Sequence, residues 1–598
     1  MKNGIFVILL AFCFCNQALA QLPKIPHLKT NRAVNDLGIK IGEKQTFSID
    51  LKKDVYYTII TQQQGIDLVV SLFDNSGKLI QEVDSPNGMF GPEKILYSPD
   101  SSGQFIISIK PLEEKSNAQQ GRYSVALNEI PGMLKKLSSE QMLQDFELLQ
   151  NAYYETRIGL WYNSRTQFDS VCNIQKGKIR DRMSALDFYR IIAPVVAYTK
   201  EGHSNIKVSD EVSAYLKQEG TYFPFCVKIL NGKVYLLNDI ENFKTKGYIV
   251  SRINGESIND ILGKFLSIEP ADGYNITSKY RWIEAAFSKY YTRYFAPAKS
   301  FKLVLIDPKD NNEVVYSNIP ACNFKEFGKI SAEVANTIPN YGYKEAATFS
   351  IDLDAGVAVL TVNSFSLDSY KNRREGFRNF LVETFKAISG AKIKNLIIDI
   401  RKNEGGEQGM EDHLLSYLIN RDYEKYKYVE IPAFTYSFLE YTDYKNEADI
   451  LKKELTEDFY RANDGRFLNR DGHYEGESPN SNNFQGNIYI LINGLTFSGG
   501  SEFAALAKNY TSAKFIGEET GGGYYGNSSG TFLKLTLPNS GITARVPLCK
   551  FVVSAKETGI PFGHGIMPDY FVQPSIDEYL KGFDSEMEYA KNLIGKQP

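Results

Sequence analysis

Short runs in which apolar and polar residues alternate occupy the N-terminal part of the chain. They include YYTIITQQ, DLVVSLFD, GQFIISIK and GRYSVALNE, separated by turn-forming sequences such as Asn-Ser-Gly and Ser-Ser-Gly. A two-residue period places alternate side chains on one face of a strand. Evenly spaced short strands without a helical period are typical of a small β-sandwich. We therefore predict a β-sandwich over residues 36–130.

Residues 137–205 follow a different period. SSEQMLQDFELLQ and SALDFYRIIAPVV carry apolar residues three and four positions apart, which is the spacing of one helix face. Each run begins with serine, a preferred residue at the start of a helix. This part of the chain is predicted to be a helical segment.

Strand patterns return over residues 222–316, in KVYLLND and GYIVSRINGES. The second run, with its Asn-Gly turn, resembles part of a PDZ domain, a module whose exposed groove binds a peptide as an additional strand. A generic hairpin is the alternative interpretation. We expect a PDZ-like module here.

From residue 345 to 590 apolar strands alternate with amphipathic helices. GVAVLTV, NLIIDIR and NIYILIN are nearly continuous apolar runs, as expected of strands whose two faces are both covered. The pattern predicts a layered α/β core. Within it, residues 421–485 are rich in tyrosine, asparagine and charge, and we interpret them as a long surface insertion.

Composition sets the broad class of the protein. The chain has 598 residues, of which 43% are hydrophobic and 23% charged, and a net charge of −3; this predicts a globular protein of roughly three or four domains. Charges of both signs are interspersed, so no basic stripe indicates a nucleic-acid partner.

Residues 1–20 join a basic start, a short apolar run and a small-residue end, the pattern of a signal peptide. Export to the periplasm or cell exterior follows, and no later run approaches the length of a membrane span.

A candidate nucleophile lies in NIYILINGLTFSGGSEFAALAKNY, where Ser498 stands between an apolar strand and a small-residue helix. A side chain at such a turn projects from the sheet edge, beside the positive end of a helix dipole. The alternative interpretation is that Ser498 only caps the helix. The local sequence leaves both open.

Three strings in order and spacing resemble the C-terminal processing, or tail-specific, serine peptidases. NLIIDIRKNEGGEQ matches the family's oxyanion loop, TFSGGSEF its nucleophile helix, and GEETGGG its Gly-Glu-x-Thr turn at residues 517–520. The resemblance implies that Ser498 is the nucleophile and that Gly405, Gly406 and Gly499 supply backbone N–H groups to the oxyanion. One branch of the family uses a lysine base that would stand at position 523, but this chain has Gly523 there.

A serine hydroxyl needs a neighbouring base near neutral pH. His203, in AYTKEGHSN, is similar to the histidine segment of the tricorn-like branch of the family. With the lysine missing, the resemblance implies that His203 is the base. The other four histidines are interpreted as structural or loop residues: His27, His413, His473 and His564. By analogy with the family, a substrate contact is the alternative interpretation for His564.

The acid that orients the histidine is the least defined part. The resemblance favours Glu557, in SAKETGIPFGHGIMPD, although its spacing from the following Pro-Asp is longer than the family pattern. Glu201 stands beside the histidine without an assigned role. Asp569, Glu518 and Glu519 are interpreted as structural.

Together these features predict a multidomain fold of α/β and β parts. It comprises a crotonase-like (ClpP-like) α/β peptidase core, a PDZ-like module, a helical segment and an N-terminal β-sandwich. The β-sandwich resembles the pre-peptidase modules that accompany secreted bacterial peptidases. The implied activity is a secreted serine endopeptidase that cleaves peptide or protein substrates near their C-termini, without metal or cofactor. Two alternatives stay open: a non-catalytic peptide-binding scaffold, and an extracellular glycan-binding protein acting through the β-sandwich.

Overall fold

The computed structural model describes residues 25–595 except 54, 85–88, 113–117, 131–133, 158–160, 340–344, 471–474 and 558. The predicted signal peptide, residues 1–20, therefore lies outside the described residues, as does His473. The chain forms two compact units, residues 1–129 and 130–598. Among the described residues, no helix has the length and apolar character needed to cross a membrane.

The N-terminal unit consists of two four-stranded antiparallel sheets, ordered β1-β8-β3-β6 and β2-β7-β4-β5. Alternate residues of both sheets, among them Ile59, Val125 and Ile107, enter one shared hydrophobic core. The two-residue period thus correctly predicted strands, which begin slightly before residue 36. The strands are β1 (Arg32–Lys40), β2 (Gln45–Leu51), β3 (Tyr57–Gln64), β4 (Leu68–Phe73), β5 (Leu79–Val83), β6 (Phe90–Tyr97), β7 (Gly103–Pro111) and β8 (Gln120–Glu129).

The second unit begins with helices that start at capping serines. Ser138 and Ser184 each form a capping box, in which the serine side chain and the residue three positions later bond to each other's backbone N–H. Ser164 does the same for a helix between them. The elements are β9 (Lys136–Leu137), α1 (Ser139–Thr156), α2 (Arg165–Lys176), β10 (Met183–Ser184), α3 (Ala185–Ala197), β11 (Asn205–Lys207) and α4 (Asp210–Glu219).

The next segment forms an antiparallel sheet ordered β12-β13-β14-β16-β17, with β15 paired to β14. The Asn-Gly turn on which the PDZ-like prediction rests joins β14 to β15, and Asn254 and Gly255 both have positive φ. The elements are β12 (Val227–Leu230), β13 (Lys233–Leu236), β14 (Ile249–Ile253), β15 (Glu256–Ser257), α5 (Ile258–Leu266), α6 (Thr277–Tyr294), β16 (Ser300–Ile306), β17 (Glu313–Pro320) and α7 (Phe324–Thr337).

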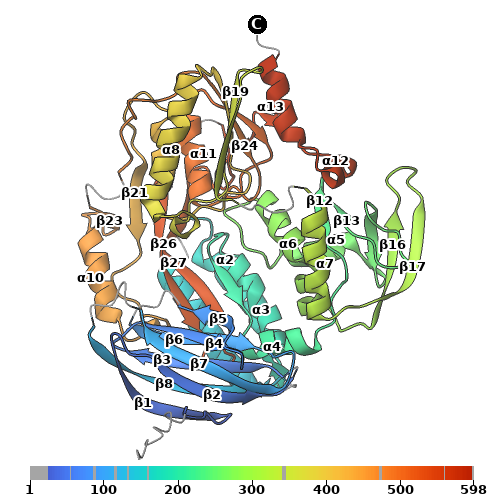
Figure 1. Ribbon diagram of the computed structural model, residues 1–598, viewed down its shortest axis with the longest axis vertical. Coiled ribbons are helices and arrows are strands. Elements are labelled where there is room, and N and C mark those ends of the chain that lie inside the picture. The colour runs from blue at the N-terminus through green and yellow to red at the C-terminus, as the bar shows by residue number, and fades with distance from the viewer. Residues whose placement is uncertain are drawn as a thin grey trace, which may run out of the picture. The chain divides into compact units, whose positions relative to one another are not determined.

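A six-stranded sheet, β18-β19-β20-β24-β25-β28, forms the α/β core. Its strands are parallel from β19 onward, whereas β18 is antiparallel. The predicted strand and helix alternation is confirmed here, with α8, α11 and α13 beside these strands in Figure 1. The elements are β18 (Ala347–Asp352), β19 (Val357–Val362), α8 (Arg373–Gly390), β20 (Asn395–Asp399), α9 (Met410–Ser416), β24 (Asn487–Ile492), α11 (Gly499–Tyr510), β25 (Lys514–Gly517), β28 (Tyr570–Phe571), α12 (Ile576–Lys581) and α13 (Ser585–Gly595).

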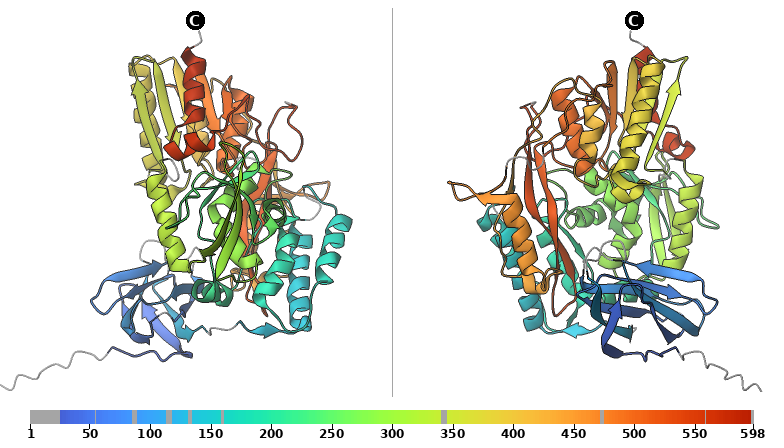
Figure 2. Two further views of the ribbon diagram at one scale, coloured as in Figure 1. Left: turned by 90° about the vertical axis from the view of Figure 1, so that its right-hand side faces the viewer. Right: turned by 60° about the vertical axis from the view of Figure 1, so that its left-hand side comes forward.

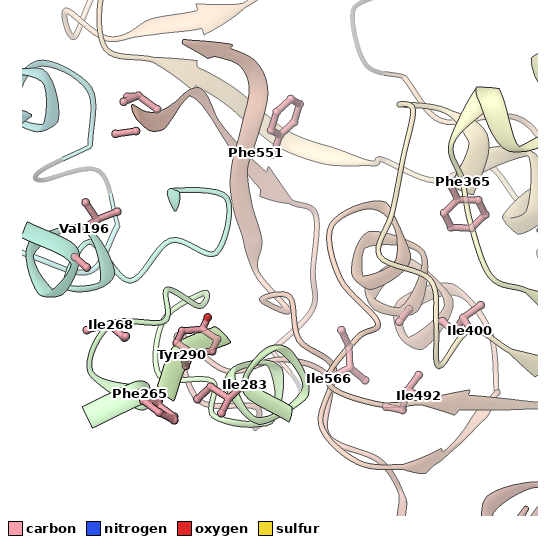
Figure 3. Packing of buried hydrophobic residues seen from close by; sticks show 14 of the residues in the cluster. Val196, Phe265, Ile268, Ile283, Tyr290, Phe365, Ile400, Ile492, Phe551 and Ile566 are labelled. Atoms are coloured by element: carbon pink, nitrogen blue, oxygen red, sulfur yellow. The ribbon is translucent and has the colours of Figure 1, made fainter. Parts of the chain in front are cut away.

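The continuous apolar character of these strands follows from burial on both faces. On β20, Ile398 enters the large core of the unit, whereas its neighbour Ile397 packs in a separate cluster with Ala590 and Ile594 of α13. Figure 3 shows Ile400 and Ile492 close together where β20 and β24 end, and Ile400 N–H donates to the Leu491 carbonyl at 3.1 Å. The carboxyl ends of the central strands are therefore held together at one place.

A second sheet, β11-β27-β21-β23-β22, is built around the long hairpin of β26 (Gly526–Thr536) and β27 (Thr543–Val553), drawn in orange-red in Figure 2. Residues 421–485 contribute β21 (Tyr426–Ile431), α10 (Ala448–Asp458), β22 (Phe459–Arg461) and β23 (Phe467–Asn469). Because β21 pairs with β27 and buries Val429 and Ile431, the interpretation of this region as a surface insertion is wrong for that strand.

Candidate active site

Ser498 occupies a strained turn and does not cap its helix. Its backbone has φ 52° and ψ −128°, and its side chain makes no cap hydrogen bond to α11. A non-glycine residue in such a region costs on the order of 1–3 kcal/mol and persists only where the surroundings impose it. Here Phe497 N–H donates to the Asn403 carbonyl at 3.0 Å, and Thr496 Oγ1 donates to the Ile400 carbonyl at 2.9 Å. The turn is therefore fastened to the loop after β20.

His203 lies directly against this serine. Its Nε2 is 3.0 Å from Ser498 Oγ, although 295 residues separate them in the sequence. β11 begins two residues after the histidine and pairs with the start of β27. This pairing holds the histidine turn at the edge of the second sheet. The 3.0 Å contact is within the range for proton transfer from a hydroxyl to an imidazole.

The histidine ring is buried and packs near two aromatic rings. Phe497 and Phe532 have centroids 4.6 Å and 5.8 Å from its own. Burial, and to a smaller degree the charge of Arg545, lowers the pKa of His203 to about 3. The ring is therefore neutral near pH 7, which leaves a nitrogen lone pair available to accept the serine proton.

No acid orients this ring in the described part of the chain. His203 Nδ1 is buried and has no hydrogen-bond partner there. Glu557 is exposed and makes no hydrogen bond to His203, so the structure does not bring this predicted residue to the site. Glu201 is buried beside the histidine, but it forms an ion pair with Arg157 at 3.2 Å and accepts no bond from the ring.

The glycines after β20 approach the nucleophile closely. Gly405 has φ 95°, and a Cβ placed on it would be 2.7 Å from both Gly499 N and Ser498 Cβ. Only glycine permits this approach. Its own N–H, however, donates to Asn403 Oδ1 at 2.9 Å, so Gly405 shapes the loop and is not an available donor. In the described part of the chain, the N–H groups of Gly406 and Gly499 donate to no protein acceptor.

The turn that carries Gly523 is also fixed to the nucleophile. Gly522 N–H donates to Ser501 Oγ at 3.0 Å, and a Cβ on Gly522 would be 3.3 Å from Ser498 N. At position 523 a Cβ would be 2.6 Å from the Gly526 carbonyl oxygen. A lysine therefore does not fit there in this loop conformation.

A buried group of charges lies behind the nucleophile helix. Lys425 Nζ is 2.5 Å from both Glu411 and Asp412, and all three side chains are almost fully buried. Burial raises the pKa of Glu411 to about 7. For Lys425, burial works against the charged form, yet the two acids hold its pKa above the ordinary value. A Cβ on Gly499 would lie 3.7 Å from Glu411, which places this group beneath the start of α11.

The remaining acids have structural contacts, as the sequence predicted. Glu518 pairs with Arg281 at 3.3 Å, and Glu519 accepts from Gly565 N–H at 2.8 Å. Asp569 accepts from Phe515 N–H at 2.8 Å and so joins the last strand of the sheet to β25.

Among the described residues, neither His564 nor His413 bonds to Ser498. His564 bonds to Glu519 at 3.1 Å, and His413 is buried on α9, where it accepts from Arg378 at 3.0 Å. His27 belongs to the N-terminal unit.

Two residues of the site had no role assigned from the sequence, Asn403 and Asp272. Asn403 uses its side chain to hold Gly405 and its carbonyl to hold the nucleophile turn. Its place in the DIRKNEGG string was a usable signal. Asp272 accepts from the backbone on both sides of the site, and no motif marks it.

Comparisons with known proteins agree with this geometry. Residues 356–572 match the model of peptidase family S41. The chain carries a family S41 peptidase domain. It is therefore a serine-type peptidase, and the resemblance to the C-terminal processing peptidases is confirmed. No curated protein matches the chain.

Among solved structures, the chain is similar in fold to mature CPAF, with a TM-score of 0.51, 14% identity, and coverage of 76% of this chain and 96% of that one. A mutant of CPAF gives a TM-score of 0.54, 14% identity, and coverage of 77% and 98%. The photosystem II D1 C-terminal processing protease gives 0.37, 14%, 76% and 98%.

Proposed function

We propose that the chain is an exported serine endopeptidase that hydrolyses peptide or protein substrates near their C-termini by Ser-His acyl transfer. The observation that carries the proposal is the 3.0 Å contact between Ser498 Oγ and His203 Nε2 at a strained turn. In this reaction Ser498 Oγ attacks the peptide carbonyl while His203 accepts its proton. His203 then protonates the leaving amine, and a water molecule releases the acyl group by the same route.

The oxyanion donors in this proposal are the N–H groups of Gly406 and Gly499. Gly405, whose N–H is bonded to Asn403, supports them by permitting the close approach. Losing one donor of such a site typically lowers turnover by about 100- to 1000-fold. Among the residues that the structure describes, no acid bonds to His203, so its contacts with the Phe497 and Phe532 rings hold the imidazole in place.

Other parts of the chain receive roles within the same proposal. The sheet of β12 to β17 is a PDZ-like module that presents the C-terminal segment of the substrate. The two-sheet N-terminal unit is a pre-peptidase-like β-sandwich. Residues 1–20 direct export to the periplasm or cell exterior, which N-terminal sequencing of the mature protein would test through a start at Gln21.

The test of the activity is covalent labelling with a fluorophosphonate, together with hydrolysis of an unstructured protein substrate. We expect Ser498→Ala and His203→Ala each to abolish both signals while the protein stays folded. Lys514→Ala, an exposed change near the same helix, serves as the control and keeps both. Full activity of the His203 variant would overturn the proposed mechanism.

The alternative of a non-catalytic peptide-binding scaffold rests on one observation, the unpartnered Nδ1 of His203. Such a scaffold would bind peptides but leave Ser498 unlabelled in the wild-type protein.

A further inference from the structure

Asp272 lies in the loop between α5 and α6, away from every motif of the family resemblance. Its side chain is buried, with 2% exposure. Both carboxylate oxygens accept backbone hydrogen bonds: Oδ1 from Gly202 N–H at 2.8 Å and Oδ2 from Gly523 N–H at 3.2 Å. One side chain therefore connects two segments that are far apart in the sequence.

These two segments carry the two halves of the active site. Gly202 immediately precedes His203. Gly523 follows Gly522, which is bonded to Ser501 Oγ in the first turn of the nucleophile helix. A path of hydrogen bonds and adjacent residues thus runs from the histidine turn through Asp272 to the nucleophile helix.

The residues after Asp272 repeat the same connection. Gly273 N–H donates to the Lys200 carbonyl at 2.8 Å, on the histidine side. On the nucleophile side, Asn275 Nδ2 donates to the Thr520 carbonyl at 2.5 Å. Residues 272–275 therefore clamp the histidine turn against the 517–523 loop.

The clamp matters because, in the described part of the chain, no hydrogen bond to Nδ1 orients the histidine ring. With Nδ1 unpartnered in the described part of the chain, the position of the ring depends on aromatic packing and on where its backbone turn is held. A shift of about 1 Å in a catalytic group can cost about 100-fold in rate.

We propose that Asp272 is a positioning residue that sets the distance between His203 and Ser498 by binding the backbone on both sides of the pair. This inference rests on the proposed Ser-His function. Asp272 touches neither reacting atom, so its effect is on geometry.

Both N–H donors require an acceptor, which makes asparagine an informative replacement. Asparagine has the shape of aspartate but only one acceptor oxygen, so its amide nitrogen would face one of the two N–H groups. Burial raises the pKa of Asp272 to about 7 against the effect of these two bonds, and Glu201 and Glu502 raise it further. Among the described residues, the partners of the Asp272 carboxylate are backbone N–H groups and not a cation, so Asp272→Asn breaks no ion pair there.

The experiment compares Asp272→Asn with a matched variant, Asp145→Asn, in the full-length protein. Asp145 is also buried and also accepts from two backbone N–H groups, those of Asn539 at 3.0 Å and Ser540 at 2.8 Å, in the turn between β26 and β27. It bonds to neither catalytic segment. The measurements are the second-order rate of fluorophosphonate labelling of Ser498, kcat and KM for a peptide substrate, and the melting temperature.

We expect Asp272→Asn to lower the labelling rate and kcat by about 10- to 100-fold with little change in KM, since the loss is one of alignment. Asp145→Asn should lower the melting temperature at least as much as Asp272→Asn does, but its Ser498 should be labelled at the wild-type rate. The proposal would be overturned if Asp272→Asn were labelled at the wild-type rate, or if both variants slowed labelling equally. It would also be overturned if Asp272→Asn lost labelling only because the protein unfolds. If instead Ser498→Ala and His203→Ala remain active, the proposed function itself fails, a result distinct from any of these.

Discussion

The buried, neutral state of His203 predicts how the stability of the protein changes with pH. Its pKa falls from an ordinary 6.5 to about 3, mainly through burial. Each pKa unit corresponds to about 1.4 kcal/mol, so the folded site disfavours the charged ring by roughly 5 kcal/mol relative to water. The side chain is only 7% exposed, so solvent screening removes little of this.

The sign of the effect on stability follows from linkage. Between pH 6.5 and 3 the unfolded chain binds a proton at this residue and the folded chain does not, so stability falls as the pH falls through this window. At pH 5 the unfolded state gains about 2 kcal/mol from this one group, compared with pH 7.5. A His203→Gln variant lacks this contribution.

The assay is urea unfolding at pH 7.5 and at pH 5.0, followed by tryptophan fluorescence. Both tryptophans, Trp161 and Trp282, belong to the unit that contains the site, so the signal reports on that unit. We expect the wild-type protein to lose about 2 kcal/mol more than His203→Gln between the two pH values. Equal losses would refute the argument that the ring is buried and neutral. The same state places the acid limb of kcat/KM below pH 5, because the base stays deprotonated there.

Three further outcomes follow from the site. Gly405→Ala should lower kcat by about 100-fold or more, because the added methyl group would lie 2.7 Å from Gly499 N. A peptidase assay at saturating substrate measures kcat, and near-wild-type turnover would contradict the close approach of the two backbones. Lys425→Met leaves two buried acids without their cation and should destabilise the protein by about 3–5 kcal/mol in urea unfolding, whereas an unchanged midpoint would show that the acids are neutral in the folded state. Glu557→Ala should keep the wild-type kcat and its pH profile, because this exposed acid does not bond to His203; a large loss of kcat would restore it as the orienting acid.

Local pattern predicted the elements of the fold well. The capping serines Ser138 and Ser184 start helices because a cap bonds to N–H groups within three residues of itself. The apolar strands of the α/β core were recognised because burial on both faces leaves no polar positions. The tyrosine-rich composition of residues 421–485 predicted a surface insertion, but β21 is partly buried through a long-range pairing with β27 that composition does not encode.

The sequence by itself determined the nucleophile turn and the glycines around it. Strand, Ser498, two glycines and helix are contiguous, so their geometry depends on short-range backbone constraints and could be read from one string. The family resemblance added His203 as its partner, but no local rule connects residues 295 positions apart.

Only the tertiary structure decided how that partner is held. The pairing of β11 with β27 brings the histidine to the serine, and Asp272 fastens both segments through backbone N–H groups that carry no sequence signature. The tertiary structure also left the predicted acid, Glu557, exposed. The physical reason is common to these findings: hydrogen bonds to backbone and burial at a distance depend on where the chain returns in space, which residue type and local period do not specify.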